Sequence, residues 1–329
     1  MRYKRLISAL LLIVAMLFCG CESGFLNSSK AYTVSNIYFD TFIELTTYGE
    51  AVPKEAIELC EKYDNLLSVT KKDSDIYKLN KQGKHDVSPE TLELIQVALD
   101  YCEESEGLFD ISVYPLSTLW DFTAENPSLP DEDKRSEAVK AVDYRKIKIE
   151  GNTITVPPNG GIDLGGIAKG YIADRIAEIY IANSLSGIIN LGGNILTVGS
   201  KPFGKTFKIG IKKPFLEGET LYNLELYSGS AVTCGVYERY FTIDEKIYHH
   251  ILNPKTGYPE TNGLDAVTVI CQSSTDADAL STTLFLMGEE KAMGYLHSRS
   301  DIHAVFIRRD GTVGLSQGLE MNGNTIKIK

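Results

Sequence analysis

The chain has 329 residues, of which 43% are hydrophobic and 23% are charged, and this is the composition of an ordinary globular protein. Its length suits one large domain or two of about 150 residues each. The composition excludes a disordered tail, a collagen-like fibre and a membrane protein with many spans. Asp and Glu number 44 against 33 Lys and Arg, with no basic block. No nucleic-acid partner is therefore expected, because phosphate binding needs a basic face.

The first twenty residues form a separate segment. Basic residues precede an apolar run from Leu6 to Phe18, whose 13 residues are too few to span about 30 Å of hydrocarbon as a helix. Residues 1–20 are therefore predicted to be a secretory signal. Gly20-Cys21 resembles the bacterial lipoprotein cleavage box, which predicts lipidation of Cys21 and an extracytoplasmic protein held on the cell membrane by its lipid. Ordinary secretion or an uncleaved anchor is the alternative.

Beyond the signal, residues 21–36 are expected to form a linker and residues 37–329 one globular domain. Apolar spacing and turn residues predict, in chain order, a strand at 37–47, helices opening at Pro53 and at Ser88-Pro89, a hairpin at 146–156, a strand at 162–164, a helix at 168–182, strands at 188–191, 208–212, 221–227, 239–243 and 266–270, a helix at 275–287, and strands at 303–308 and 325–329. Strands outnumber helices and cluster as hairpins. This predicts an α+β fold, with mixed, largely antiparallel sheets and helices packed on them.

The strongest chemical signal is Asp163-Leu-Gly-Gly-Ile-Ala-Lys169-Gly, between a predicted strand and a predicted helix. The two glycines allow backbone N–H groups to approach an anion, and the helix N-terminus adds positive potential. Lys169 can then meet a phosphate or the edge of a flavin. A tight turn with Asp163 as a local cap is the alternative. The segment is neither a Walker loop nor a G-x-G-x-x-G fingerprint.

A second signal is Asp278-Ala-Leu-Ser-Thr282 on the late predicted helix. Asp278, Ser281 and Thr282 stand at positions i, i+3 and i+4, and hence on one helix face. Carboxylate and hydroxyl oxygens are hard ligands suited to Mg²⁺, which keeps waters and shares phosphate oxygens. Capping of the helix start together with a polar surface is the alternative interpretation.

A third signal is a pair of histidines. His249 and His250 stand on a predicted strand that runs into a turn rich in Pro and Gly. Alternation along the strand turns one of them inward. The pair is a candidate for catalysis, and it lacks a third ligand at the spacing usual for a zinc site.

Six segments, taken together and in this order, resemble the ApbE family of FAD:protein FMN transferases. They are F-D-I-S-V-Y-P-L-S-T-L-W (109–120), D-L-G-G-I-A-K-G-Y-I-A-D (163–174), N-L-G-G-N (190–194), T-C-G-V-Y-E-R (233–239), H-H-I-L-N-P-K-T-G-Y-P (249–259) and A-D-A-L-S-T (277–282). The resemblance covers about residues 37–314. It implies a T-fold-like α+β architecture and a Mg²⁺-dependent enzyme that moves the FMN part of FAD onto a Thr hydroxyl of a partner protein and releases AMP. The implied partner is extracytoplasmic, such as a flavinylated subunit of a membrane electron-transport complex.

The resemblance also implies roles for individual residues. Metal positions of the family match Gly166, through its carbonyl, and Asp278, Ser281 and Thr282. FAD-binding positions match Phe39, Thr70, Leu108, Phe109, Asp110, Asp163, Lys169 and Leu252. His250 matches the second His of a family motif and is the candidate catalytic residue, as a base or as a group that orients phosphate.

The chain departs from the family pattern at four places. Phe39-Asp40 stands where many members have Met-Gly, and Thr70 stands where many have an aromatic residue that covers the nucleotide. Cys234 replaces a Ser and is interpreted as structural, and Asn253 replaces an Asp. Two alternatives to the transferase stay open. One is a Mg²⁺-dependent FAD pyrophosphatase, in which water replaces the protein hydroxyl, and the other is a non-catalytic flavin-binding lipoprotein.

Overall fold

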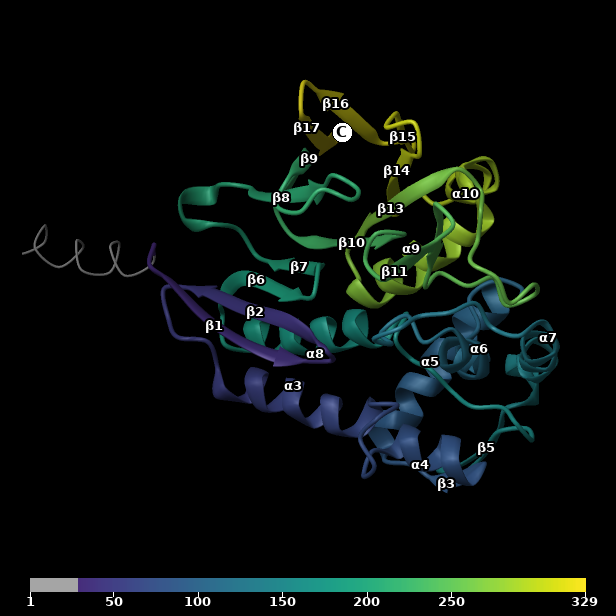
Figure 1. Ribbon diagram of the computed structural model, residues 1–329. Coiled ribbons are helices and arrows are strands. Elements are labelled where there is room, and N and C mark those ends of the chain that lie inside the picture. The colour runs from purple at the N-terminus through teal and green to yellow at the C-terminus, as the bar shows by residue number, and fades with distance from the viewer. Residues whose placement is uncertain (1–28) are drawn as a thin grey trace, which may run out of the picture.

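An eight-stranded sheet forms the centre of the computed structural model, which describes residues 29–329 (Figure 1). Its strands are β1 (Ala31–Tyr38), β2 (Thr41–Tyr48), β6 (Ser186–Leu191), β7 (Asn194–Val198), β10 (Gly229–Gly235), β13 (Leu264–Cys271), β14 (His303–Arg308) and β15 (Val313–Leu315). Their order in space is β1-β2-β6-β7-β10-β13-β14-β15, and every neighbouring pair is antiparallel. The predicted signal and Cys21 lie outside the described residues.

Three helices cover one face of this sheet: α3 (Lys54–Leu67), α8 (Ala168–Ala182) and α9 (Ser274–Met287) (Figure 1). Helix α8 contacts β6 and β7, helix α9 contacts β7, β10 and β13, and the two helices pack against each other. Val267 and Val269 of β13 belong to the same apolar cluster as Leu280 and Leu284 of α9. Alternate apolar side chains of the strand therefore hold this helical layer.

A four-stranded sheet packs on the other face of the large sheet. Its strands are β8 (Phe207–Lys212), β9 (Thr220–Leu226), β16 (Leu319–Asn322) and β17 (Thr325–Ile328), in the order β16-β17-β9-β8, with β17 parallel to β9. Ala266 and Ile270 of β13 join Leu224 and Ile326 in this second apolar layer. Because both faces of β13 are covered, all of its residues are buried.

The helices α4 (Asp75–Gln82), α5 (Pro89–Glu104), α6 (Tyr114–Trp120) and α7 (Glu132–Ala141) form a group at one end of the molecule (Figure 1). The other remaining elements are β3 (Lys84–Asp86), β4 (Lys148–Glu150), β5 (Thr153–Thr155), β11 (Tyr240–Ile243), β12 (Lys246–His249), α10 (Glu289–Leu296) and 3₁₀ turns at Ile111–Val113, Tyr144–Lys146 and Pro202–Gly204. Trp120 packs with Phe241 of β11, and its indole N–H donates to the Gly257 carbonyl at 2.8 Å. Within residues 29–329, no helix combines the length and apolarity needed to cross a bilayer.

The expected α+β class, with largely antiparallel sheets, is confirmed. The helix predicted at 168–182 has these bounds, and the helix predicted at 275–287 begins one residue earlier. The hairpin predicted at 146–156 is the β4–β5 pair.

The strand predicted at 37–47 is instead a hairpin. Strands β1 and β2 are joined by Phe39 and Asp40, whose φ angles are 56° and 54°. A two-residue loop with positive φ at both positions matches the twist of antiparallel strands. The predicted linker was also too long, because its residues 31–36 belong to β1 at the edge of the large sheet.

The strand predicted at 162–164 was wrong as well, since this segment is irregular. The Asn80 side chain donates to the Ile162 carbonyl at 2.8 Å and accepts from the Ile162 N–H at 2.7 Å. The Asp163 N–H donates to the Ile111 carbonyl at 2.8 Å. These bonds satisfy the backbone groups that a neighbouring strand would otherwise pair.

Candidate active site

The predicted metal residue Asp278 lies where α8 packs against α9. Its carboxylate is 5% exposed and accepts the Gly170 N–H at 2.8 Å. This N–H is one of the first in α8 and has no partner within its own helix, and the helix N-terminus favours a negative charge there. Burial raises the pKa of Asp278, whereas the Lys169 ammonium favours its charged form.

Only glycine fits at position 170. A Cβ there would lie 2.2 Å from the Ser274 carbonyl oxygen and 2.7 Å from the Cβ of Asp278. Both distances are below any real contact of a Cβ atom. The close approach of the two helices, and with it the hydrogen bond to Asp278, depends on Gly170.

Asp174 makes the matching contact in the opposite direction. From α8 it accepts the N–H groups of Ser274 at 2.8 Å and Thr275 at 2.9 Å, and the Thr275 hydroxyl at 2.6 Å. A carboxylate of each helix therefore caps the N-terminus of the other. Asp174 ends the second of the six segments, but its capping role depends on α9, about a hundred residues away, and the sequence reasoning missed it.

The two hydroxyls predicted as metal ligands differ in surroundings. Ser281 is buried, and its hydroxyl donates to the Asp278 carbonyl at 2.8 Å within the helix. The half-buried Thr282 hydroxyl lies 3.8 Å from the Cys234 sulfur of β10. Burial raises the pKa of Cys234 to about 12, so the thiol is neutral at pH 7. This agrees with the expectation that Cys234 is not a nucleophile.

Asp163 shapes the loop before α8. One carboxylate oxygen accepts the Gly165 N–H at 2.9 Å, and the other accepts the Ser117 hydroxyl at 2.9 Å. The Lys169 amine donates to the Gly165 carbonyl at 3.2 Å. These contacts match the local-cap interpretation of Asp163, and its contact with FAD stays a prediction.

Leu108, Phe109 and Asp110, which are predicted to line FAD, have side chains in three different environments. Phe109 is buried, and a Cβ on Gly166 would lie 3.0 Å from its ring, so the structure brings these two predicted residues together. Leu108 packs against the apolar cluster that includes Leu280 and Leu284 of α9. Asp110 instead accepts the N–H groups of Ser112 at 2.8 Å and Tyr144 at 3.2 Å, and burial raises its pKa.

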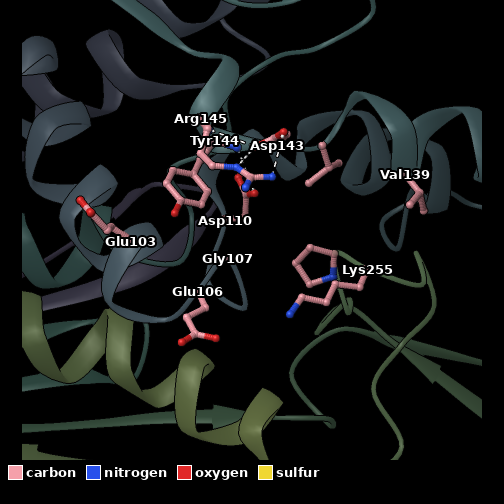
Figure 2. Close-up of a pocket in the computed structure, with 11 residues that line it drawn as sticks. Glu103, Glu106, Gly107, Asp110, Val139, Asp143, Tyr144, Arg145 and Lys255 are labelled. Carbon is pink, nitrogen blue, oxygen red and sulfur yellow. Dashed lines mark hydrogen bonds and ion pairs between the residues drawn. The ribbon is translucent and has the colours of Figure 1, made fainter.

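A cavity of about 670 Å³ lies on the Asp110 side of this segment (Figure 2). Tyr144 and Asp110 line one wall, and Lys255, from the turn after the paired histidines, lines another. Pro254, next to Lys255, also lines the cavity. The other lining residues are Glu103, Glu106, Gly107, Val139, Val142, Asp143 and Arg145. The cavity therefore joins two of the six segments, and its walls carry charges of both signs.

The paired histidines have different environments. His249 is buried, and its Nε2 lies 2.9 Å from the Glu260 carbonyl, which accepts only, so Nε2 carries the proton. His250 is half-buried, and its Nδ1 lies 3.3 Å from the Arg239 carbonyl. By the same argument the neutral ring of His250 has an unprotonated Nε2. Burial, together with the nearby charge of Arg239, lowers the pKa of His250 to about 3, and burial lowers that of His249 to about 4.

Leu252 is a core residue. Its side chain is 6% exposed and belongs to the apolar cluster of Leu116, Trp120 and Phe241. Other apolar side chains therefore cover the Leu252 side chain, and its contact with flavin stays a prediction.

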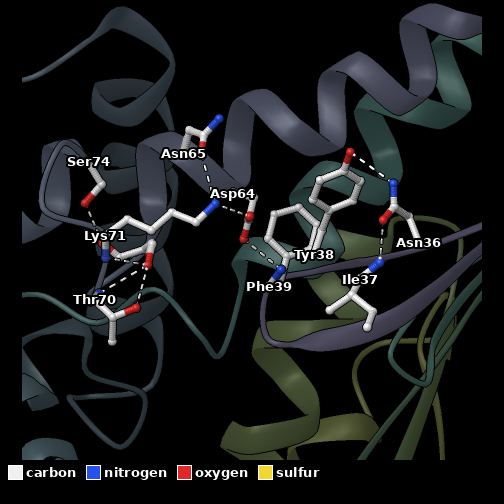
Figure 3. A network of polar contacts seen from close by, with 10 residues as sticks. Asn36, Ile37, Tyr38, Phe39, Asp64, Asn65, Thr70, Lys71 and Ser74 are labelled. Carbon is white, nitrogen blue, oxygen red and sulfur yellow. Dashed lines mark hydrogen bonds and ion pairs between the residues drawn. The ribbon is translucent and has the colours of Figure 1, made fainter.

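Phe39 and Thr70 lie near one another through a polar network (Figure 3). The Phe39 N–H donates to Asp64 at 2.8 Å, and Lys71, next to Thr70, forms an ion pair with the same carboxylate. The Thr70 hydroxyl is exposed and lies 3.1 Å from that of Ser68. The turn between β1 and β2 and the loop that contains Thr70 are thus linked through Asp64. At position 70 the chain has a hydroxyl, whereas many members of the family have an aromatic ring there.

Asn194 and Arg239 are further site residues that the sequence reasoning missed. Asn194 is 2% exposed, and its Oδ1 accepts the Ser274 hydroxyl at 2.7 Å. A hydrogen bond from its side-chain amide favours the charged form of Asp278. Asn194 and Arg239 each lie in one of the six segments, and this could have marked them as site residues. Their contacts with Ser274 and His250, however, depend on tertiary structure.

Comparison with known proteins gives consistent results. The ApbE family model matches residues 39–306. A protein from Klebsiella pneumoniae named FAD:protein FMN transferase is 34% identical over 301 residues, covering 88% of this chain and 93% of its own length, and one of the same name from Treponema pallidum is 30% identical, covering 93% of each. The ApbE protein of Thermotoga maritima superposes with a TM-score of 0.81 at 31% identity, covering 88% of this chain and 97% of that one. The flavin transferase ApbE of Vibrio cholerae gives a TM-score of 0.76 at 26% identity, with the same coverage. This chain therefore belongs to the ApbE family.

Proposed function

We propose that this protein is an FAD:protein FMN transferase that works with Mg²⁺ and attaches FMN to a Thr hydroxyl of an extracytoplasmic partner. The curated relatives that carry this name match it over nearly their whole length. One observation in the structure carries the proposal. The Gly170 N–H, next to Lys169 in the first turn of α8, donates to the Asp278 carboxylate at 2.8 Å. The lysine predicted to bind phosphate and the carboxylate predicted to bind the metal therefore meet at the same helix N-terminus.

The residues at the metal position fit Mg²⁺. They offer the Asp278 carboxylate, the Ser281 and Thr282 hydroxyls and the Gly166 carbonyl, all of them hard oxygen ligands. In the part of the chain that the structure describes, no three His, Cys, Asp or Glu side chains are grouped to hold a metal. A single carboxylate suits Mg²⁺, which takes its other ligands from water and phosphate. When bound, the ion neutralises charge on the pyrophosphate of FAD.

The reaction needs little covalent help from the chain. The acceptor oxygen bonds to the phosphorus of the FMN half, the pyrophosphate P–O bond breaks, and AMP leaves. Lys169 and the N-terminus of α8 hold the phosphates and stabilise the charge that develops. Nε2 of His250 accepts the proton of the acceptor hydroxyl. A pKa of about 3 keeps this imidazole neutral but makes it a weak base, and a bound pyrophosphate anion raises that pKa.

Hydrolysis of FAD is the second candidate function. Thr70 is exposed and its hydroxyl faces Ser68, so this side chain offers no ring to cover the nucleotide. Water then has an easier path to the phosphorus, and the products become free FMN and AMP.

A single experiment separates the two functions. Purified protein is mixed with FAD, Mg²⁺ and candidate partners, and the masses of all products are measured. A partner that gains one FMN supports transfer, whereas free FMN and AMP without an adduct supports hydrolysis and contradicts transfer.

Variants on α9 test the metal position. Asp278→Asn is expected to lower the rate by about 10³-fold, because it removes charge stabilisation by the metal. Asp276→Asn, on the same helix but bonded to Ser273, is the matched control and should keep most activity. A normal rate for Asp278→Asn at saturating Mg²⁺ contradicts the assignment.

We also propose that the protein is held on the membrane, outside the cytoplasm, by lipid on Cys21. The support is the short apolar run that ends at Gly20-Cys21. In a fractionated culture, Cys21→Ser should move the protein from the membrane to the soluble extracytoplasmic fraction. If the variant stays on the membrane, an uncleaved apolar anchor holds it instead.

A further inference from the structure

Two polar side chains lie on the face of the large sheet that α8 and α9 cover. Asn194 begins β7, and alternation puts it on the same strand face as Leu196 and Val198, which belong to the main apolar cluster. Ser230 of β10 is paired with Leu196, so it lies on this face too. Asn194 is 2% exposed and Ser230 is fully buried, so each needs a hydrogen-bond partner within the protein.

Ser274, in the first turn of α9, joins these two residues. Its buried hydroxyl donates to Oδ1 of Asn194 at 2.7 Å and lies 3.0 Å from the Ser230 hydroxyl. The Ser274 N–H donates to Asp174 of α8 at 2.8 Å, which also fixes the backbone that carries this hydroxyl. The Ser230 hydroxyl lies 3.1 Å from the Ile195 carbonyl of β7. The three side chains therefore form one buried chain of hydrogen bonds between β10, α9 and β7.

The direction of these hydrogen bonds follows from the charge at one end of the chain. A hydrogen bond from the Asn194 amide favours the charged form of the Asp278 carboxylate. A carboxylate only accepts, so Nδ2 of Asn194 serves Asp278 and Oδ1 is left for Ser274. Ser274 gives its one hydroxyl proton to this oxygen, and its lone pairs remain for Ser230. The amide therefore cannot turn over without losing both of its bonds.

Two donors from two different elements thus hold Asp278. The Gly170 N–H of α8 donates to one carboxylate oxygen at 2.8 Å, and the Asn194 amide comes from β7. An ionised carboxylate has about four acceptor positions, so about two remain for a cation and its waters. Hydrogen-bond partners of a metal ligand orient it, and their loss costs about 10–100-fold in metal affinity.

We propose that Asn194 is a positioning residue for the metal, oriented by the Ser274 and Ser230 hydroxyls so that its amide sets the direction of the Asp278 carboxylate. Asn194 acts through Asp278 and is not itself a metal ligand. The inference rests on the metal position of the proposed function, and it adds β7 and β10 to the elements that shape that position.

Mn²⁺, a paramagnetic substitute for Mg²⁺, provides the test. The full chain with FAD, and without a partner protein, is titrated with Mn²⁺, and free Mn²⁺ is measured by electron paramagnetic resonance. Asn194→Ala should weaken Mn²⁺ binding by about 10–100-fold. Ser274→Ala removes one neutral hydrogen bond and should weaken it by about two- to tenfold. Thr197→Val is the matched control, because it removes a buried hydroxyl of β7 that donates to the Gly229 carbonyl at 2.9 Å, and it should bind Mn²⁺ as wild type does.

A double mutant tests whether Ser274 acts through Asn194. If it does, adding Ser274→Ala to Asn194→Ala should weaken Mn²⁺ binding no further, whereas independent structural effects would multiply. Urea unfolding checks that each variant is folded. If Asn194→Ala does not fold, Asn194→Ser replaces it with the same expected loss, because its shorter side chain cannot reach both Ser274 and Asp278.

Each result of this titration decides the inference. Wild-type affinity in Asn194→Ala, or an equal loss in Thr197→Val, overturns it. Losses that multiply in the double mutant overturn the role of Ser274. If wild type binds no Mn²⁺, the metal position of the proposed function fails and the inference fails with it. If wild type binds Mn²⁺ but releases no AMP from FAD with any partner, only the proposed function fails, since the Mn²⁺ measurement needs no turnover.

Discussion

Gly170→Ala tests whether the α8–α9 contact forms the site. The new methyl group would lie 2.2 Å from the Ser274 carbonyl oxygen, where ordinary contact begins at 3.4 Å, so the two groups must separate by about 1.2 Å. Both atoms belong to packed helices, so neither can move alone. We expect α9 to shift and the hydrogen bond from the residue 170 N–H to Asp278 to weaken.

Two opposing effects set the size of the change. Alanine in a helix is better than glycine by about 1 kcal/mol. Overpacking costs about 1–3 kcal/mol, and weakening a hydrogen bond to a charged group costs about 1.5–3 kcal/mol. The free energy of unfolding should therefore fall by about 1.5–5 kcal/mol. A displacement of about 1 Å at a catalytic group costs about 10²-fold in rate, which is the loss expected for FMN transfer.

Urea unfolding and the mass-based transfer assay measure both effects. Gly294→Ala in α10 is the matched control, because a Cβ at Gly294 meets nothing within 4 Å. It should raise the free energy of unfolding by up to about 1 kcal/mol and leave transfer unchanged. If Gly170→Ala is as stable and as active as this control, the close approach of the helices does not shape the site.

Two further predictions concern Asp174 and His249. Asp174→Asn weakens the cap of α9 and should raise the Mg²⁺ concentration for half-maximal transfer by about 10–100-fold, with kcat restored at excess Mg²⁺. A lower kcat at an unchanged Mg²⁺ requirement would refute this positioning role. His249 titrates near pH 4 when folded and near its ordinary value of 6.5 when unfolded, so the unfolded state binds its proton first. The free energy of unfolding should therefore fall by up to about 3 kcal/mol as the pH drops from 6.5 to 4, and His249→Gln should lessen that slope in urea titrations. Equal slopes for both proteins would contradict the buried neutral imidazole.

Local features of the sequence determined several elements of the fold. The predicted helix at 168–182 has the observed bounds, and the helix predicted at 275–287 ends where α9 ends, at Met287. The β4–β5 hairpin likewise follows from Gly151-Asn152 between alternating strands. These features depend on apolar spacing and turn residues a few positions apart, so a short stretch of sequence is enough to predict them.

The site was only partly predictable. The spacing of Asp278, Ser281 and Thr282 places them on one helix face, and the family resemblance points to Lys169 and Phe109. Spacing alone cannot tell that Phe109 packs on Gly166, or that Leu252 is sealed in the core. Those facts depend on which helices and strands meet.

Tertiary structure decided the contacts that organise the chemistry. Asp278 bonds to Gly170, 108 residues away, and Cys234 meets Thr282, 48 residues away. Ile162 forms no strand because the Asn80 amide, 82 residues away, takes both of its backbone groups. A buried polar group must find a partner wherever packing brings one, since leaving it unpaired costs about 1–3 kcal/mol. The sequence by itself determined which residues have the chemistry, and the packing of α8 against α9 and the sheet decided which of them meet.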